Sequence, residues 1–349
     1  MSEWPIDPPI KPMEARVREA FPADAGWAFE PKWDGFRALA WSGTPRLDSR
    51  NLRPLLRYFP ELTPALEVLP AGTVVDCEVV VITNDRLDFD ALSQRIHPAE
   101  SRIEKLAVET PAQLIAFDVL ALRGHNLIAM SYAERRAALV PLLTELSSAH
   151  AAWHLTPATE DPEVAQRWFE EFEAAGCDGI VAKRLGDRYE AGERRMVKIK
   201  QRHTVDVVVG GYRLHKDGDK IGALLLGMYD EAGELHFVGH CSSFSAADRV
   251  TMLEQFQRLE QDASFGEDAR RPEMEHRWSA QRDKSWVPVD PVVVMEVSHD
   301  QLSGPRFRHA SRFLRWRPDK LPEECSLSQL DRASGAGIET VWTAAEPRN

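Results

Sequence analysis

One lysine of this chain lies where a primary amine could act as a nucleophile. Lys32 occurs in the stretch Phe29-Glu30-Pro31-Lys32-Trp33-Asp34-Gly35-Phe36-Arg37, between bulky apolar residues and two positions before a carboxylate. An amine attacks phosphorus or a carbonyl carbon only in its neutral form, and apolar surroundings and nearby cations favour that form. The stretch therefore indicates covalent catalysis by Lys32, with Asp34 beside it. A surface lysine in a turn would give the same pattern, so the rest of the chain has to supply a substrate site.

The elements that must position Lys32 are strands. Apolar residues alternate from Trp27 to Phe29 and again from Phe36 to Ala40, which predicts two strands joined by a bend over 32–35. Further strands are expected over 73–83, 113–122, 179–183 and 196–200, and helices over 51–69, 89–96, 131–146 and 161–175, the first of them interrupted at Pro54, Pro60 and Pro64. Ser131 and Glu134 form a capping-box pattern at the start of the third of these helices.

The pattern changes after residue 200. Short strands separated by polar turns are expected over 206–212, 223–229, 235–239 and 292–297, with one helix over 246–259. A small β-barrel with a single helix is typical of the OB-fold. We therefore expect an α+β protein with two domains: residues 1–202, built of antiparallel sheets and helices, and an OB-fold domain over 203–349 that ends in a polar tail. The change in pattern puts the boundary near residues 200–204.

Composition restricts the possible functions. The 349 residues are 43% hydrophobic and carry a net charge of −12, which indicates a globular protein that does not insert into a membrane. The four cysteines are scattered, which argues against disulfides and a zinc ribbon, and the first residues lack a signal-peptide pattern. We therefore expect a cytoplasmic protein. Two basic stretches, 183–202 and 303–320, could still bind DNA, because counterion release is local.

Polar residues on the predicted strands form an ordered set. Their order and spacing resemble the covalent nucleotidyltransferase superfamily, which includes polynucleotide ligases and mRNA-capping enzymes. The matching motifs are Lys32-Trp33-Asp34-Gly35-Phe36-Arg37, Ser49-Arg50-Asn51, Val75-Asp76-Cys77-Glu78, Phe117-Asp118, Asp178-Gly179-Ile180-Val181-Ala182-Lys183, Met196-Val197-Lys198-Ile199-Lys200 and Arg312-Phe313-Leu314-Arg315-Trp316-Arg317-Pro318-Asp319-Lys320. The departures are Cys77 for glycine, Asp178 for glutamate, Met196 for tryptophan, and Pro318. Within the superfamily the chain resembles most the small bacterial ATP-dependent DNA ligases of the LigC type.

The resemblance implies a fold, an activity and a set of site residues. The first domain would be an adenylation domain, and the protein would seal nicks in DNA through a lysine–AMP intermediate and a 5′-adenylated DNA. Glu78 would hold the ribose, Phe117 would stack on the purine, and Arg50 would contact phosphate. Implied catalytic residues are Lys32, Asp34, Lys198 and Lys200. Implied nucleotide-binding residues are Glu30, Arg37, Arg50, Glu78, Phe117, Lys183, Lys198, Lys200, Arg312, Arg317, Asp319 and Lys320. Asp178 and Glu78 would bind Mg²⁺ or Mn²⁺.

The resemblance also implies partners. Nicked or gapped double-stranded DNA would be the substrate, in DNA repair or recombination, with Ku and a primase-polymerase as family partners. We expect a monomer at the nucleoid in the cytoplasm. Two alternatives stay open: a GTP-dependent guanylyltransferase of the mRNA-capping type, and a non-catalytic OB-fold module that binds DNA.

Overall fold

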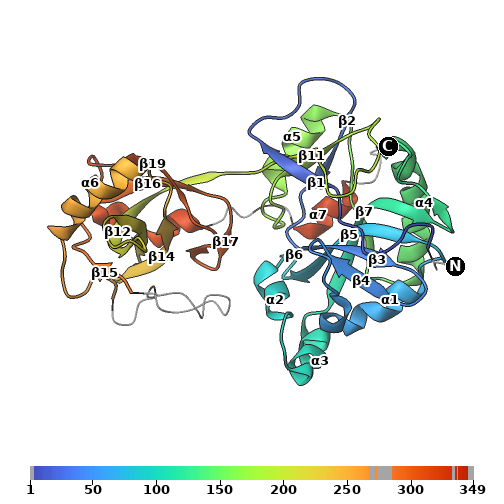
Figure 1. Ribbon diagram of the computed structural model, residues 1–349, viewed down its shortest axis with the longest axis horizontal. Helices are drawn as coiled ribbons and strands as arrows, with labels where there is room; N and C mark the ends of the chain where they lie inside the picture. Colours follow the sequence, from blue (N-terminus) through green and yellow to red (C-terminus); the bar gives the residue numbers. More distant parts are fainter. Residues whose placement is uncertain (1–3, 267–271, 273–284, 332–334, 336, 345–349) are drawn as a thin grey trace. The chain divides into compact units, whose positions relative to one another are not determined.

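The computed structural model describes residues 4–266, 272, 285–331, 335 and 337–344. The chain forms two compact units (Figure 1), and we describe each separately. Unit 1 comprises residues 1–201 and 333–349, and unit 2 comprises residues 202–332. Together they give the α+β fold expected from the sequence. None of the helices in the described residues has the length and apolar character needed to cross a bilayer.

The larger sheet of unit 1 contains half of the strands that carry the predicted nucleotide-binding residues. In sheet order its strands are β4 (Arg46–Ser49), β3 (Phe36–Trp41), β5 (Val74–Thr83), β7 (Ala112–Leu122) and β8 (His125–Asn126), with β6 (Arg86–Leu87) on β5 and β9 (Trp153–Leu155) on β7. The helix α4 (Tyr132–Ala149) packs its leucines against this sheet, and the Ser131–Glu134 capping box is present as expected. Apolar residues between sheet and helix form the main core of unit 1.

The smaller sheet of unit 1 carries the motifs around Lys32 and over residues 178–183 and 196–200. Its order is β1 (Glu14–Arg18), β11 (Arg194–Ile199), β10 (Ile180–Arg184) and β2 (Trp27–Pro31). One face packs against α5 (Pro162–Glu171) and forms a second core around Trp168, Val197 and Ile199. The opposite face presents Glu30, Val181 and Lys198, which are aligned across three neighbouring strands. These side chains therefore lie on the face opposite the core around Trp168.

The segment 51–69 is helical only in short pieces, in agreement with the interruptions expected at its prolines. It forms two 3₁₀ turns, Leu56–Tyr58 and Pro60–Leu62, followed by the short helix α1 (Thr63–Glu67). Proline lacks an N–H and clashes with the preceding turn, so Pro54, Pro60 and Pro64 break the helix while Leu62 and Leu66 are still buried. The helices α2 (Phe89–Gln94) and α3 (Glu100–Glu109) follow, and only α2 was expected.

Unit 2 is an antiparallel sheet with one helix, as expected of an OB-fold. In sheet order its strands are β14 (Leu235–Cys241), β13 (Ile221–Tyr229), β12 (His203–Leu214), β16 (Val294–His299) and β19 (Arg312–Trp316), with β15 (Val287–Pro288) on β12. The pair β17 (Leu302–Ser303) and β18 (Arg306–Phe307), the helix α6 (Ala246–Gln257) and the 3₁₀ turns Pro322–Glu324 and Leu327–Leu330 complete it. Its core is separate from the cores of unit 1.

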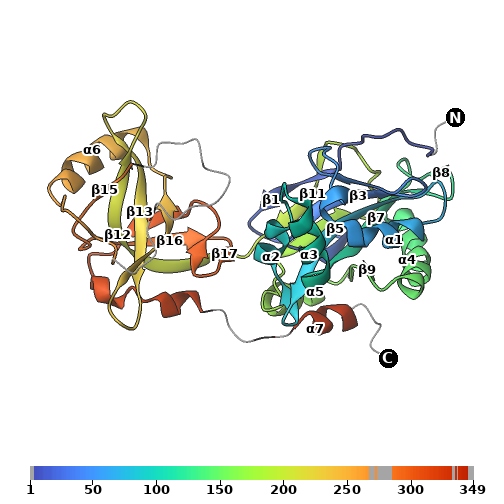
Figure 2. The same ribbon diagram turned by 90° about the horizontal axis from the view of Figure 1, so that it is seen from below.

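The C-terminal segment differs from the expected polar tail of the OB-fold domain. Residues Ile338–Thr343 form the helix α7, which belongs to unit 1 (Figures 1 and 2). Ile338 and Val341 are buried in the core that also contains Trp27 and Trp33. The tail was assigned from its polar composition, but two apolar residues three positions apart are enough to bury one side of a short helix. The first unit ends at 201, next to the expected boundary.

Candidate active site

Two motifs far apart in the sequence are joined by backbone hydrogen bonds at the end of the smaller sheet. The Lys32 N–H donates to the Gly179 carbonyl, and the Asp178 N–H donates to the Lys32 carbonyl, both at 2.8 Å. Gly179 has a φ of +118°, and a Cβ there would lie 2.0 Å from the Ile199 carbonyl oxygen. Only glycine fits this position. The backbones of Lys32 and Asp178 are thus fixed relative to each other.

The Asp178 carboxylate is shared by two predicted catalytic lysines. Its Oδ2 atom lies 2.6 Å from Lys32 Nζ and 3.2 Å from Lys200 Nζ. The Asp178 side chain is only 3% exposed, whereas the Lys32 side chain is 20% exposed and the Lys200 side chain 18%. A nearly buried anion therefore holds two amines that solvent, and hence a substrate, can still reach.

Lys198 adds a third cation on the same face. Burial lowers the pKa of Lys198, and repulsion from Lys32, Lys200 and Arg50 lowers it further, while Asp178 opposes the shift. Arg50 itself is exposed in the turn after β4, where its N–H donates to the Arg37 carbonyl. The repulsion means that these four positive charges are close enough to act together on one anion, such as a phosphate.

A buried network connects the two sheets of unit 1. Lys183 Nζ lies 2.8 Å from Glu30 Oε2 and donates a hydrogen bond of 2.8 Å to the Phe117 carbonyl. The hydroxyl of Tyr132, the first residue of α4, donates to Glu30 Oε1. Because each of these charges is paired and hydrogen-bonded, its burial is tolerated. Tyr132 was not predicted, since nothing in the sequence around the capping box indicates a partner for Glu30.

Arg37 reaches the same region from the larger sheet. Its guanidinium donates to both oxygens of Asp76, at 3.0 and 2.6 Å, and its Cζ atom lies 5.2 Å from the centre of the Phe117 ring. Tyr189 donates a third hydrogen bond to Asp76, at 2.7 Å. Burial favours the neutral form of Arg37, but the charge and hydrogen bonds of Asp76, together with Tyr189 and Glu78, outweigh it and raise the pKa of Arg37. Asp76 therefore positions Arg37. The feature of the sequence that could have indicated this role is the position of Asp76, two residues before Glu78.

Phe117 occupies an irregular position in its strand. Asp76 is paired with Asp118 and Cys77 with Ala116, so the register leaves Phe117 as the extra residue of a bulge. Bulges re-aim side chains and often occur beside active sites. The Phe117 ring is 8% exposed and lies below Lys183 Nζ at 4.8 Å. It is therefore flanked by two cations, Arg37 and Lys183, instead of packing with the apolar residues of the sheet core.

Glu78 is the second predicted metal ligand. It is aligned with Arg37 on the neighbouring strand and is only partly exposed. Burial raises the pKa of Glu78 to about 8; Lys32 and Arg37 oppose this shift, while Asp34 and Asp76 add to it. The charges of Lys32 and Asp34 thus act on Glu78, which places these predicted residues in one site. A carboxyl that is costly to ionise alone would ionise when a cation binds, so the donor set fits a divalent ion.

Two departures from the family motifs are accommodated by packing. Cys77 is fully buried in the core of the larger sheet, where its thiol donates to the Ala38 carbonyl, and burial raises its pKa well above the ordinary value. Met196 is 5% exposed and packs in a cluster with Leu39 and Trp41. Both side chains are therefore structural. All four cysteines of the chain are free and buried.

The predicted residues of unit 2 form an ion-pair network. Arg317 Nη1 lies 2.8 Å from Asp206 Oδ1, Arg317 Nη2 lies 2.8 Å from Asp319, and Lys320 Nζ lies 3.4 Å from Asp206. The hydrogen bonds from Arg317 lower the pKa of Asp319 to about 2. Arg312 is exposed on β19. Asp206 was not predicted, although an acid between Val205 and Val207 in a buried strand is a detectable signal.

The basic stretch 183–202 contributes to an arginine-lined hollow in unit 1. The hollow has a volume of about 410 Å³, and its lining residues are Arg16, Arg18, Asp24, Trp27, Arg184, Asp187, Arg194 and Arg195. Arg184 is aligned with Trp27, two positions beyond the buried Ala182–Phe29 pair. Since side chains two apart in a strand share a face, Arg184 lies on the opposite face of the smaller sheet from Glu30 and Lys198. The hollow is thus separate from the lysine site.

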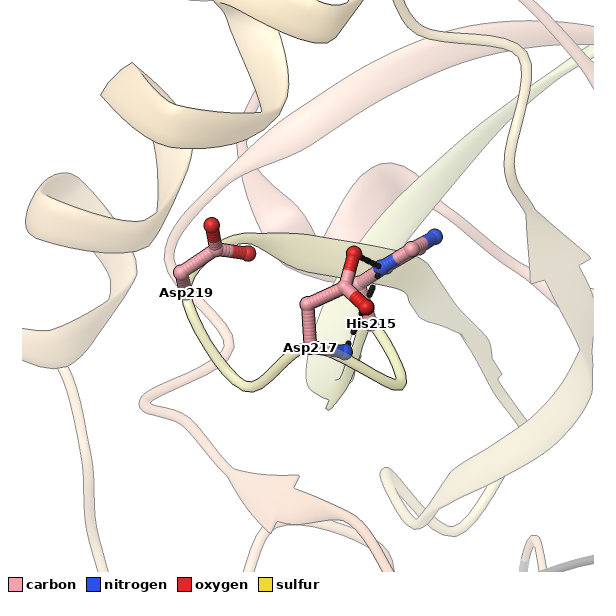
Figure 3. Close-up of side chains that lie close together, drawn as sticks. All are labelled: His215, Asp217 and Asp219. Atoms are coloured by element: carbon pink, nitrogen blue, oxygen red, sulfur yellow. Dashed lines mark hydrogen bonds and ion pairs between the residues drawn. The ribbon is translucent and has the colours of Figure 1, made fainter.

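Two further clusters, in turns of unit 2, contain possible metal ligands. Figure 3 shows His215, Asp217 and Asp219 in the turn between β12 and β13, with His215 bonded to Asp217. Lys220 Nζ lies 3.4 Å from both aspartates and already supplies a positive charge. The other cluster is Asp230, Glu234 and His236, in which Asp230 accepts hydrogen bonds from backbone N–H groups of its own turn. Both clusters are therefore explained as turn structures.

Comparison with known proteins identifies the family of both parts of the chain. Residues 10–200 match the family model for the ATP dependent DNA ligase domain, and residues 217–320 match that for the ATP dependent DNA ligase C terminal region. The chain is 46% identical to DNA ligase C of Mycobacterium tuberculosis, with 97% of this chain and 98% of that protein aligned. It is 31% identical to the multifunctional non-homologous end joining DNA repair protein LigD of the same organism, covering 85% of this chain and 37% of that protein.

A solved structure shows the same fold at lower identity. The structure described under "DNA binding with a minimal scaffold", of a Lig E DNA ligase, is 15% identical, covers 87% of this chain and 99% of that chain, and has a TM-score of 0.56. The two matched domains, in this order, account for both units of the molecule. The chain therefore belongs to the family of ATP-dependent DNA ligases.

Proposed function

We propose that Lys32 is the nucleophile of the ligation reaction. Its neutral amine attacks the α-phosphorus of ATP, an N–P bond forms, the bond from phosphorus to the pyrophosphate oxygen breaks, and the amine releases a proton. The observation that carries this assignment is the lysine pair on Asp178: Lys32 and Lys200 share one nearly buried oxygen and still reach solvent. Asp34 follows Lys32 in the bend and completes the motif.

The remaining cations stabilise the charge that develops on the phosphate oxygens. Lys198 and Lys200 are held by the smaller sheet, and Arg50 lies within range of Lys198. Fixed charges of this kind need no reorganisation when the reaction occurs. The family implies a divalent cation, and we assign Asp178 and Glu78 as its ligands, with Mg²⁺ or Mn²⁺ as the ion. When bound, it would neutralise part of the phosphate charge.

The other predicted residues form the nucleotide cradle. In our assignment the adenine stacks on Phe117, the ribose hydroxyls bind Glu78, and Arg50 contacts phosphate. Arg37 and Lys183 flank Phe117, and Glu30 pairs with Lys183. After pyrophosphate departs, AMP passes from Lys32 to the 5′-phosphate of the nick. The 3′-hydroxyl then attacks that phosphate, the new phosphodiester bond forms, and AMP leaves.

The substrate is nicked or gapped double-stranded DNA, and we propose that the arginine-lined hollow binds its backbone. The guanidinium group of arginine matches the geometry of a phosphate, and each phosphate that the protein neutralises steepens the salt dependence of binding. The double substitution Arg16→Ala/Arg18→Ala should therefore reduce the slope of log Kd against log salt for a nicked duplex by about one to two. Arg123→Ala, at an exposed arginine paired with Glu145, is the control and should leave the slope unchanged. An unchanged slope in the double variant would refute the assignment.

The cellular role that we propose is DNA repair. The name of the LigD relative includes non-homologous end joining, which supports a role at strand breaks. Ku and a primase-polymerase are the partners that the family resemblance suggests. We place the protein as a monomer at the nucleoid in the cytoplasm.

Transfer of label from α-labelled nucleotide to the protein tests the central assignment. The parent chain, incubated with α-labelled ATP and Mg²⁺, should retain acid-labile label in denaturing electrophoresis, and Lys32→Ala should retain none. Lys105→Ala, at an exposed lysine of α3, should be labelled like the parent. Label from GTP in place of ATP would indicate the guanylyltransferase alternative, absence of label from both would indicate the non-catalytic alternative, and label on Lys32→Ala would place the nucleophile elsewhere.

A further inference from the structure

The helix α7 is attached to unit 1 by a specific set of contacts. The Ile338 N–H donates to the Asp85 carbonyl at 2.8 Å, and the Glu339 N–H lies 3.4 Å from Asp85 Oδ1. A Cβ on Gly337 would lie 1.7 Å from Asp85 Oδ2, so a larger residue there would have to displace the Asp85 carboxylate. Ile338 is 3% exposed and Val341 is fully buried. Apolar burial and directed hydrogen bonds thus fix one position for α7.

This position brings an aromatic ring to the residue that follows Lys32. The Trp342 ring stacks on the Trp33 ring, with centres 5.1 Å apart and planes at 26°, and on the His154 ring at 4.6 Å and 10°. Trp33 is 6% exposed, and its indole N–H donates to the Thr156 hydroxyl at 2.9 Å. Trp33 is therefore held by the Thr156 hydroxyl and by the Trp342 ring of α7.

The position of the Lys32 amine is set by the backbone of Lys32 and by the residue that follows it. Its backbone is bonded to Asp178 and Gly179, and the next residue is clamped through its ring. Attack on phosphorus requires the amine within a few tenths of an ångström of one position, so small displacements slow the reaction strongly. The side chain of Lys32 is otherwise 20% exposed and would be free to move once phosphate replaces its contact with Asp178.

We propose that Trp342 is a positioning residue for the nucleophile: α7 clamps Trp33 and so fixes Lys32 for adenylation. The proposal rests on Lys32 being the nucleophile, as proposed above. It assigns to the C-terminal end of the chain a task in the first step of the reaction only. Once AMP has reached the DNA, the Lys32 amine no longer forms a bond, and the clamp has no further effect.

The test compares Trp342→Ala with Trp342→Phe in the full chain. In single-turnover labelling with α-labelled ATP, Trp342→Ala should form lysine–AMP about tenfold more slowly at saturating ATP, a loss typical of misplacement by a fraction of an ångström. The ATP concentration for half-maximal rate should stay unchanged, because the nucleotide cradle is intact. Trp342→Phe keeps a ring for stacking and should recover most of the rate. Sealing of a nick that carries a pre-made 5′-adenylate should equal that of the parent in both variants.

A matched variant separates positioning from stability. Val341→Ala removes a buried methyl pair from α7 but leaves the rings in place, so it should lower the Tm while the adenylation rate below that temperature stays close to the parent value. The proposal is overturned if Trp342→Ala adenylates like the parent, if Trp342→Phe is as slow as Trp342→Ala, or if Trp342→Ala loses sealing of the adenylated nick to the same extent. Failure of the proposed function is distinct, since the parent chain itself would then form no lysine–AMP.

Discussion

At the scale of single residues, Asp178 has the most demanding position in the site. It binds the amines of both Lys32 and Lys200 through one oxygen while it is almost buried. Asp178 is one methylene shorter than the commoner glutamate, so its backbone has to lie close to the amines that it binds. Gly179 permits this approach, because its positive φ and contact with Ile199 exclude any side chain. The close approach of Lys32, Asp178 and Ile199 therefore depends on glycine at position 179.

Glu78 gives the pH dependence of stability a sign that can be tested. Its folded-state pKa of about 8 lies above its ordinary value of 4.5, so the folded chain keeps a proton that the unfolded chain releases. The contribution of Glu78 to stability is then fully present below its pKa in the unfolded chain, and it is lost as the pH rises through its pKa in the folded chain. Without nucleotide and metal, the Tm of the parent should fall relative to Glu78→Gln by a few degrees between about pH 5 and about pH 9.

The control for this experiment is an acid outside the site. Glu67→Gln, at the exposed end of α1, should give a pH profile parallel to that of the parent. A Glu78→Gln profile that also runs parallel to the parent would mean that Glu78 is ionised at ordinary cost in the folded chain, and the electrostatic account of this carboxyl would fail.

At the scale of elements, the strands that carry the motifs were predictable and their irregularities were not. Alternating or β-branched runs identify β2, β3, β5 and β7, because one or both faces of these strands are buried. The bulge at Phe117 is not visible in such a pattern, because nothing in the run Ala116, Phe117 and Asp118 marks which residue is the extra one. β1, whose residues are mostly exposed, was missed for the opposite reason: it has almost no apolar face.

The bulge makes Phe117 available as a stacking surface, and this can be measured. Phe117→Ala should raise the KM for ATP in lysine–AMP formation by roughly 5- to 150-fold, because base–aromatic stacking contributes about 1–3 kcal/mol. Phe117→Tyr retains the ring and should stay within a few-fold of the parent. The maximal rate at saturating ATP should change little in either variant, since neither alters Lys32 or its cations.

Loss of the ring also leaves space below Arg37 and Lys183. The Tm of Phe117→Ala therefore has to be measured alongside the kinetics, and the comparison made well below it. An unchanged KM for ATP in a folded Phe117→Ala protein would return Phe117 to a purely structural role in the sheet.

At the scale of the whole molecule, the change in pattern after residue 200 indicated a division into two units. The sequence did not indicate that the C-terminal segment returns to unit 1. The β-rich, turn-rich sequence after 200 is typical of a small barrel, and its core is indeed separate. The attachment of α7 depends on Asp85 and Trp33, which are more than 250 positions earlier. A single sequence does not show such a contact, because it is made by a helix of six residues with two buried side chains and one stacked ring.

The same division predicts that the reaction steps can be separated. Arg317, Asp319 and Lys320 belong to unit 2, and we propose that they orient pyrophosphate during attack by Lys32, as a moving domain would. Asp319→Ala should then reduce lysine–AMP formation at least tenfold, yet seal a nick with a pre-made 5′-adenylate within about threefold of the parent. The fold should survive the change, because the Asp319 side chain is 61% exposed and Arg317 keeps its pair with the buried Asp206.

Two comparisons decide whether Asp319 acts on chemistry or on structure. Glu323→Ala removes an exposed acid four positions away and should leave both steps unchanged. Asp206→Asn weakens the anchor of Arg317 inside unit 2, so it should lower the Tm more than Asp319→Ala does. If Asp319→Ala loses sealing of the adenylated nick as completely as it loses adenylation, the network acts in every step or maintains the OB-fold, and orientation of pyrophosphate is not its particular task.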